Sequence, residues 1–345
     1  MKLISVNPPK NLSKEDEHLF KPFLTYKLDP VTIKRLKNVF VTYSGLCIDK
    51  KGLVKESHHD YPDQYNDYLQ EAARYFRISN DKPENLIRLK NDQIYLLIHH
   101  PWSKNYYHWI CESILRVWMA KDALKDMVLL LPSYNNELGF IKRSLEPFNF
   151  KNIYFIPYKK CLYIEDLCMP QIKPVVDGYD SDKVKQIRAF YLKYVLIEKK
   201  IFLELGERIY ISRRKAARKK IYNEGELEGL LRAFNFTIIN AEEFTFFEQI
   251  SIFSNASYLI SIHGSGLTNM LFMQEKAHVL EFHKKKTNGK DWHSLAFWYL
   301  ADCLGHYYYH QLCDPTDLNA DYFSADFIVD IKRFEENLGL MLPNG

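Results

Sequence analysis

The strongest constraint on the fold is an alternation of short apolar runs with segments of helical periodicity in the C-terminal part of the chain. Apolar runs of strand length stand at residues 208–212, 236–239, 258–262, 278–282 and 306–312. Segments with helical spacing separate them, at residues 223–234, 246–255, 266–273 and 292–304. This density of strand–helix units is typical of a doubly wound, nucleotide-binding domain. We therefore expect a Rossmann-like domain over residues 181–320, with an amphipathic helix in residues 321–345.

The N-terminal part shows a related pattern and predicts a second domain over residues 1–180. Paired short strands are expected at residues 38–52, buried strands at 93–100 and 127–132, and a helix at 106–121. A stretch with two prolines and a glycine at residues 169–182 is the best linker candidate. The sequence predicts an α/β protein with two Rossmann-like domains facing a cleft.

Net charge, cysteine content and hydropathy limit the partners and the compartment that we expect for the protein. A net charge of +4 is too small to indicate a nucleic-acid partner, and the six cysteines show no Cys-x-x-Cys pair, as expected of reduced, buried thiols. No apolar segment of signal-peptide length precedes Pro8 and Pro9, and the uncharged run at residues 249–274 is too polar to span a membrane. We expect a cytoplasmic protein.

The turn after the expected strand at residues 258–262 contains His263, Gly264, Ser265 and Gly266. The two glycines permit positive φ and a close approach of a ligand to the backbone. A helix that begins here would direct unpaired N–H groups at an anion such as a phosphate. By itself the turn is equally consistent with an ordinary helix entry.

A basic segment follows the first strand of the same domain. Seven basic residues and no acidic one lie between Arg208 and Lys220. Ligands of open α/β sheets bind at the carboxyl ends of strands, so Arg213 is expected to hold a phosphate, whereas most of the lysines are expected to be solvated. A nucleic-acid patch is the least favoured alternative, because the run lacks interleaved aromatic residues. Together, Arg213 and the glycine turn favour a phosphate site.

Two further residues of this domain, His263 and Glu281, each have two possible roles. His263 is a potential donor to a phosphate or an acceptor, or simply a packed histidine. Glu281 ends an apolar run, where a carboxylate can accept both ribose hydroxyls, although a strand-end surface glutamate would look the same.

The helix expected at residues 106–121 places His108, Glu112 and Arg116 on one stripe, at spacings of four residues, next to apolar residues such as Trp109. His108 or Glu112 would be a general base if the stripe faces a cleft. An intrahelical ion pair on a solvent-exposed face is the alternative, with equal weight.

One pattern suggests a metal site. Asp180 and Asp182 form an Asp-x-Asp pair of the kind that holds a divalent cation on a nucleotide diphosphate. The pair stands directly before a helix, however, where Asp and Ser are ordinary N-caps, and helix capping is the favoured interpretation. We expect no metal and no cofactor.

Four ordered segments together resemble glycosyltransferase family 61. They lie at residues 108–118, 210–227, 246–272 and 279–282. The sequence departs from many members of the family in having Ser265 between the two glycines and Leu115–Arg116 where a proline commonly follows the leucine.

The resemblance implies a GT-B fold and an inverting, metal-independent transfer from a UDP-sugar to a glycan or lipid-linked glycan hydroxyl in surface polysaccharide assembly. Such an acceptor would bring the protein into peripheral contact with the membrane. It places Arg213 and the Gly264–Gly266 turn on the diphosphate and Glu281 near the ribose. The helix with His108, Glu112, Trp109 and Arg116 would lie on the acceptor side. A non-catalytic nucleotide- or glycan-binding protein is the alternative.

Overall fold

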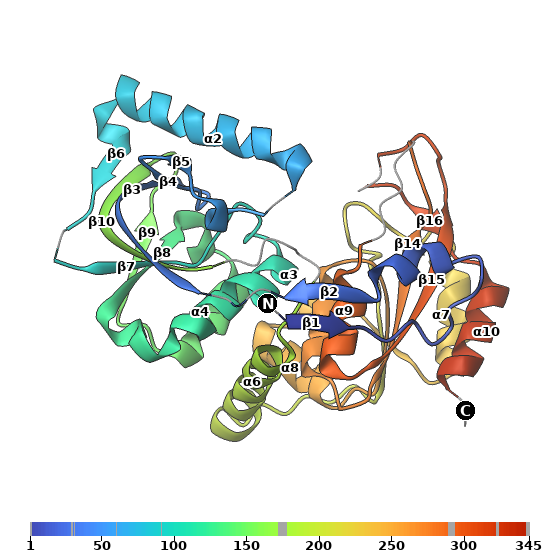
Figure 1. Cartoon of the computed structure of the whole chain (residues 1–345). Helices are drawn as coiled ribbons and strands as arrows, with labels where there is room; N and C mark the ends of the chain where they lie inside the picture. The colour runs from blue at the N-terminus through green and yellow to red at the C-terminus, as the bar shows by residue number, and fades with distance from the viewer. Residues whose placement is uncertain are drawn as a thin grey trace. The chain divides into compact units, whose positions relative to one another are not determined.

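The computed structural model describes residues 2–28, 30, 32–59, 61–90, 92–171, 178–288, 294–321 and 324–342. The chain forms two compact units, Met1–Leu28 with Asp177–Gly345, and Asp29–Val176 (Figure 1). Below they are called the C-terminal and the N-terminal unit. Each contains its own sheet and helices, as expected for a two-domain α/β protein.

The first 28 residues belong to the C-terminal unit, whereas the expected boundary at residue 180 places them in the N-terminal domain. They carry a two-stranded antiparallel sheet, β1 (Lys2–Ser5) and β2 (Thr25–Leu28), and the short helix α1 (Glu17–Phe20). The indole Nε1 of Trp298 donates to the carbonyl of Asn7 at 2.8 Å, and the Tyr299 hydroxyl donates to that of Phe23 at 2.6 Å. Hydrogen bonds of this kind join the segment to a distant part of the sequence.

The C-terminal unit is built on a six-stranded sheet. Its spatial order is β12 (Thr237–Ile239), β11 (Arg208–Ile211), β13 (Tyr258–Ile262), β14 (His278–Lys284), β15 (Tyr307–Pro315) and β16 (Phe327–Ile328). The first five strands are parallel and β16 is antiparallel. All five strands expected from the alternation are therefore present in a parallel arrangement.

Helices cover both faces of this sheet (Figure 1). On one face, α7 (Glu224–Ala233) and α10 (Ile331–Met341) bury Leu227, Leu231, Phe334 and Leu338 against the strands. The helices α6 (Ser181–Leu192), α8 (Phe246–Ser254) and α9 (Ala296–Leu304) pack with one another on the opposite face. The apolar residues of α6 follow the helical period and bury one side of the helix, whereas most residues of α8 and α9 are buried.

The strand order creates a topological switch point. The connection that leaves β11 leads to β12 on one side of it, and the connection that leaves β13 leads to β14 on the other side. Because these two connections leave neighbouring parallel strands in opposite directions, a crevice is expected at the carboxyl ends of β11 and β13. Ligands of open α/β sheets bind at such points.

The N-terminal unit has a mixed sheet. Its order is β5 (Gly52–Leu53), β4 (Cys47–Asp49), β3 (Ile33–Val41), β10 (Cys161–Pro170), β7 (Ile94–Leu97), β8 (Met127–Pro132) and β9 (Asn152–Ile156), and β6 (Leu86–Arg88) pairs with β10. From β10 to β9 the strands are parallel, while β3, β4 and β5 are antiparallel. The expectation of a Rossmann-like domain thus holds only for the parallel half, because the first strands are joined by tight turns that cannot form crossovers.

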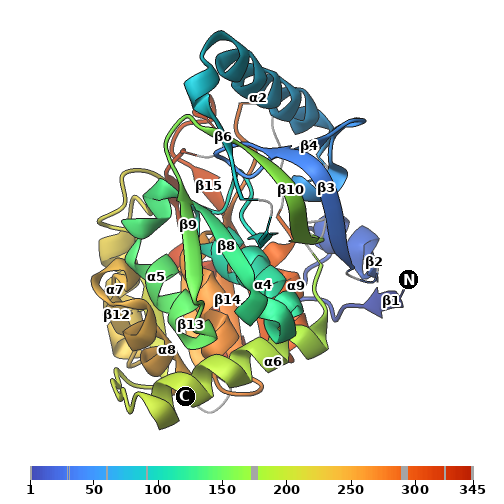
Figure 2. The same cartoon turned by 90° about the vertical axis from the view of Figure 1, so that its left-hand side faces the viewer.

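The helices of this unit are shorter, apart from α2 (Pro62–Asp81), which packs Tyr68 and Ala72 on the antiparallel strands (Figure 2). The helix expected at residues 106–121 begins as α3 (Tyr106–His108), continues through a π-helical turn at Trp109–Ser113, and ends as α4 (Ile114–Ala120). A further helix, α5 (Gly139–Leu145), follows β8. π-Helical turns are rare and are found frequently at functional sites.

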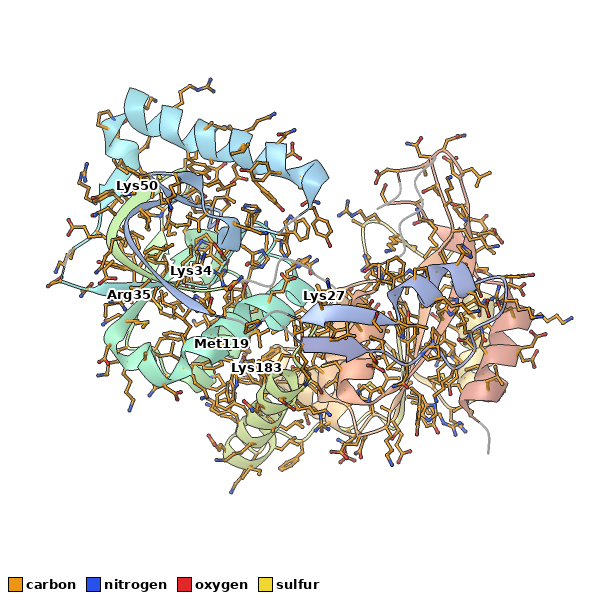
Figure 3. The ribbon with its side chains drawn as sticks, viewed as in Figure 1. Lys27, Lys34, Arg35, Lys50, Met119 and Lys183 are labelled. Carbon is orange, nitrogen blue, oxygen red and sulfur yellow. The ribbon has the colours of Figure 1, made fainter. Side chains whose placement is uncertain are left out.

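Two aspartates, Asp166 and Asp180, have structural roles. On the sheet surface, Asp166 of β10 pairs with Lys37 and with Arg35 of the neighbouring β3; Arg35 is labelled in Figure 3. At the start of α6, the Asp180 carboxylate accepts from the backbone N–H of Lys183 at 3.3 Å and from its Nζ at 2.7 Å. The capping interpretation of Asp180 is confirmed.

No helix among the described residues is long and apolar enough to cross a membrane. All six cysteines are free, and five of them are buried.

Candidate active site

The first constellation lies where β7 ends and the α3–α4 helix begins. Asn105 caps this helix, because its side chain accepts from the N–H of Tyr107 at 2.9 Å. One turn further on, Nδ1 of His108 lies 2.9 Å from Oε2 of Glu112. The predicted i, i+4 pair is therefore formed. It does not lie on a solvent-exposed face, since only 10% of the Glu112 side chain is exposed.

Two buried histidines complete the surroundings of Glu112. Nε2 of His59 lies 3.1 Å from Oε1, and Nε2 of His100 lies 3.0 Å from Oε2. Burial alone would raise the pKa of Glu112, but His59 and His108, together with hydrogen bonding from His100, hold it well below its usual value. Burial lowers the pKa of His100 to about 3, so this ring is neutral. Glu112 is thus a buried, ionised carboxylate that accepts from imidazole N–H groups.

The contact with Glu112 determines which ring nitrogen of His108 can accept a proton. Nδ1 faces the ionised Glu112 and carries the proton, so Nε2 keeps its lone pair. The His108 side chain is 16% exposed, in contrast to His59 and His100, which are completely buried. A histidine whose Nδ1–H is held by a carboxylate is the arrangement that serves as a general base in hydrolytic triads.

Two other residues predicted for the acceptor side are buried in the unit. Arg116 is 2% exposed, and its guanidinium donates to the carbonyls of Pro170 at 2.8 Å and Ile98 at 2.7 Å. Trp109 is completely buried, and its indole N–H donates to the Ser144 hydroxyl at 2.7 Å. Neither side chain is therefore open to a bound acceptor. Arg116 holds the ends of β7 and β10 together, and Trp109 joins the helix to α5.

The second constellation lies at the switch point of the C-terminal unit. Arg213 follows β11 and Gly264 follows β13, two adjacent strands that pair Ile211 with Ser261. A Cβ added to Gly264 would stand 2.9 Å from Nη1 of Arg213, so the guanidinium lies directly on the glycine. The sequence prediction that these two residues converge is thus met by the geometry.

The guanidinium of Arg213 is incompletely satisfied. Nη2 donates to the carbonyl of Arg218 at 3.3 Å, and the buried Nε has no hydrogen-bond partner within the described chain. Burial lowers the pKa of Arg213, although it remains a cation. A buried guanidinium N–H without an acceptor is costly unless an anion occupies the site.

The glycine turn differs from the sequence prediction. Gly264 has φ 168°, which is extended backbone, and Gly266 is absent from the residues with positive φ. Its β-carbon would instead meet the Ile211 side chain at 3.3 Å. The segment from Ser265 to Phe272 is a 3₁₀-helix rather than an α-helix. The glycines are therefore required for close packing against β11 and Arg213, and not for a left-handed turn.

Glu281 lies inside β14, which continues to Lys284, and it is completely buried. Nδ1 of His263 lies 2.5 Å from Oε1, Nε2 of His283 lies 3.1 Å from the same oxygen, and the Tyr308 hydroxyl donates to Oε2 at 2.6 Å. The surface alternative for Glu281 is wrong, because the residue is completely buried and these three side chains contact its oxygens. Its place near the ribose stays a prediction. Burial opposes its ionisation, yet His283 and His263 keep its pKa well below the usual value.

His263 is the exposed member of this group, with 26% of its side chain accessible. Burial in its pocket, together with the nearby Lys219, lowers the pKa of His263 to about 4. The ring is neutral at pH 7, with its Nδ1 proton on Glu281, so Nε2 is an acceptor. The C-terminal unit thus repeats the histidine–glutamate pairing of the N-terminal unit.

Both clusters bring metal-ligating atoms together. One carboxylate oxygen and two imidazole nitrogens lie within 4.8 Å of one another in His59–His100–Glu112 and in His263–Glu281–His283. A metal ligand must direct a lone pair at the ion. In the first group, Nδ1 of His100 accepts from the Trp102 N–H at 3.4 Å, which places the ring proton on Nε2, toward Glu112. In the second group, His263 directs its Nδ1 proton at Glu281, so this nitrogen offers no lone pair to a metal ion. The donor atoms therefore suit hydrogen bonding better than metal binding.

Sequence reasoning did not identify His59, His100 or Trp102, whose ring stacks on His59 with centroids 4.2 Å apart. The signal for His100 was present, because the pair His99–His100 follows directly on an apolar strand whose carboxyl end is a usual site position. His59 gave no such signal, since it lies in a loop before α2 and reaches Glu112 only through the tertiary fold.

In a comparison with family models, residues 106–280 match Glycosyltransferase 61. A search of curated proteins found no significant match. The matched segment includes the His108–Glu112 helix, the Arg213 loop and the Gly264 turn, and ends one residue before Glu281. Because the model covers half of the chain, the protein belongs to the glycosyltransferase 61 family and is a glycosyltransferase, a transferase of class EC 2.4.

Proposed function

We propose that this glycosyltransferase transfers a sugar from a UDP-sugar to a glycan hydroxyl, with inversion and without a metal ion. The two units would be the donor-binding and acceptor-binding domains of a GT-B type enzyme, with the donor on the C-terminal unit. The acceptor would be a glycan or a lipid-linked glycan in surface polysaccharide assembly. The resemblance of the four sequence segments supports this choice of acceptor.

The observation that carries the proposal is the position of Arg213 on Gly264 at the switch point. The strand order β12-β11-β13-β14-β15 directs a ligand to this edge, and Nε of the guanidinium has no hydrogen-bond partner among the residues that the structure describes. Because Gly264 has no β-carbon, the guanidinium of Arg213 lies against the backbone. A diphosphate is the ligand that matches a buried cation at the carboxyl ends of parallel strands.

The acceptor hydroxyl would be activated by His108. Nε2 takes the hydroxyl proton while the oxygen forms a bond to the anomeric carbon, and the bond from that carbon to the diphosphate oxygen breaks on the opposite face. The diphosphate leaves with the electron pair. Glu112 acts as a positioning residue, since it holds the Nδ1 proton and stabilises the imidazolium that forms.

The leaving diphosphate needs positive charge, which many transferases obtain from a divalent cation. Here Arg213 stands at the position where that charge develops, and electrostatic stabilisation of this kind is a large contribution to catalysis. The side chains of the chain itself would therefore replace the metal. His263 offers Nε2 as an acceptor to a donor hydroxyl, with Glu281 as its positioning partner.

The test is release of UDP from UDP-glucose, UDP-galactose, UDP-N-acetylglucosamine and UDP-xylose, each with and without a mixture of oligosaccharide acceptors, in EDTA. We expect acceptor-dependent release with at least one donor, lost in His108→Ala. Release that requires Mn²⁺, or that is unchanged in His108→Ala, would contradict the proposal.

A further inference from the structure

The N-terminal unit has a pocket of about 750 Å³ between α2 and the turn that joins β9 to β10, here called the α2 pocket. Ligand pockets of proteins commonly measure about 300–1,000 Å³. His108 and Glu112 are not among the described residues that line it, so it is separate from the proposed base. Its size suits a ligand with more than one sugar ring.

The walls of the α2 pocket carry charges of both signs. Within the described part of the chain, these charges belong to Asp67, Glu71, Arg74, Arg77 and Lys159. Such a mixture matches neither a polyanion nor a polycation. Hydroxyl groups, in contrast, donate to carboxylates and accept from guanidinium and ammonium groups. The lining therefore favours an uncharged ligand that is rich in hydroxyl groups.

A row of tyrosine rings, Tyr158, Tyr43 and Tyr134, leads away from this pocket. Tyr158 lines the pocket and is 66% exposed, although Nζ of Lys159 lies 5.1 Å from its ring centroid. Its ring meets that of Tyr43 edge to face, with centroids 5.5 Å apart, and Tyr43 meets Tyr134 in the same way at 5.8 Å. Tyr134 and Tyr158 follow the parallel strands β8 and β9. Tyrosine combines an apolar ring, on which the C–H groups of a sugar can pack, with a polar hydroxyl.

The tyrosine row and α2 both extend toward His108. At one end of the row, Nζ of Lys104 lies 5.7 Å from the ring centroid of Tyr134. Lys104 belongs to the same loop as Trp102, whose ring lies 4.9 Å from that of His108. The ring of His59, just before α2 begins, lies 5.6 Å from that of His108. The row and the helix thus connect the pocket with the proposed base.

We propose that the α2 pocket and the tyrosine row bind the acceptor as an uncharged oligosaccharide of several sugars, with its reacting sugar at His108. The inference rests on the proposed function, which leaves the length and the charge of the acceptor open. The sugars beyond the reacting one pack on Tyr134, Tyr43 and Tyr158 and direct hydroxyl groups at the charged walls of the pocket. Their binding energy holds the reacting hydroxyl in position, as contacts remote from the reaction do in other enzymes.

The test is the UDP-release assay in EDTA with cello-, chito- and xylo-oligosaccharides, each from the monosaccharide to the hexasaccharide. We expect kcat/KM to rise with chain length in at least one of these series. Tyr158→Ala removes an exposed ring and is expected to lower kcat/KM for the hexasaccharide of that series about tenfold. Calorimetric titration with the same hexasaccharide in the absence of a donor is expected to show a similar loss of affinity.

Tyr222→Ala is the matched control, because this tyrosine is 78% exposed and belongs to the C-terminal unit. It is expected to keep the length dependence of the wild type. A value of kcat/KM that does not change with chain length, or equal values for Tyr158→Ala and the wild type, would overturn the oligosaccharide site and leave the proposed function intact. Hexasaccharide binding that depends on Tyr158, in a protein that releases no UDP with any acceptor, would instead uphold the site and overturn the proposed function.

Discussion

Replacing Glu112 by Gln tests the base assignment most sharply, because it removes one charge and almost no volume. The carboxylate lies 2.9 Å from Nδ1 of His108 and stabilises the imidazolium that forms as the acceptor proton is taken. Two unit charges about 4 Å apart interact by about 4 kcal/mol at an effective dielectric constant of about 20. That energy corresponds to about three orders of magnitude in rate, within the range usual for general-base catalysis.

The same substitution affects stability in a pH-dependent way. The amide directs N–H groups at imidazole N–H groups, so at least one buried donor is left without an acceptor, at a cost of about 1–3 kcal/mol. Because the folded-state pKa of Glu112 is depressed, its contribution to stability is present above the unfolded-state pKa and is lost as pH falls through the folded-state pKa. The stability difference between wild type and variant is therefore expected to shrink on acidification.

The assay is kcat for UDP release, combined with urea unfolding at neutral and acidic pH. Glu165→Gln, at an exposed position of β10, is the matched control and is expected to leave both measurements unchanged. A folded Glu112→Gln protein with kcat within about threefold of the wild type would refute the role of Glu112 as the positioning partner of the base.

Two further substitutions probe the donor site and the attachment of the N-terminal segment. Gly264→Ala places a β-carbon 2.9 Å from Nη1 of Arg213, so the affinity for UDP, measured by calorimetry, is expected to fall about tenfold. Gly229→Ala is the control, because a β-carbon on this residue of α7 would have no neighbour within 4 Å. It is expected to leave the affinity unchanged and to raise the free energy of unfolding by about 0.5–1 kcal/mol. The hydrogen bond from His310 holds the pKa of Asp16 below its usual range, with Arg333 2.8 Å from the carboxylate. Asp16→Asn is expected to cost about 1–3 kcal/mol in urea unfolding at neutral pH, and progressively less as pH falls toward the folded-state pKa. An equal loss at every pH would show that the charge of Asp16 contributes nothing.

Local pattern predicted the strands and helices of the C-terminal unit well, because each strand there is a short apolar run between helical segments. It could not predict the placement of residues 1–28 on this unit. Bonds such as that from Trp298 to Asn7 join positions far apart in sequence, and no local periodicity reports them. The antiparallel half of the other sheet was recognised only as paired strands, since strand direction depends on partners and not on composition.

For the candidate site, the sequence identified groups that follow strands, and these do converge: Arg213 lies on Gly264. The predicted reason for Gly264, a positive φ, was wrong. A close approach of Arg213 also requires glycine, and the sequence alone cannot distinguish the two reasons. Glu281 looked like a strand end because β14 continues through polar residues to Lys284. His59 was missed because only the folded chain brings it to Glu112.

The central claim is a donor site that uses side chains of the protein in place of a metal ion. Titration of UDP in EDTA against the wild type, Arg213→Ala and Arg214→Ala tests it most directly, since Arg214 is the adjacent arginine but pairs outward with Glu228. A metal-free donor site predicts binding by the wild type and Arg214→Ala, and an affinity about 10- to 100-fold lower in Arg213→Ala, as expected for one charge-assisted hydrogen-bonding group. UDP binding that appears only when Mn²⁺ is added, or equal affinities of Arg213→Ala and the wild type, would contradict it.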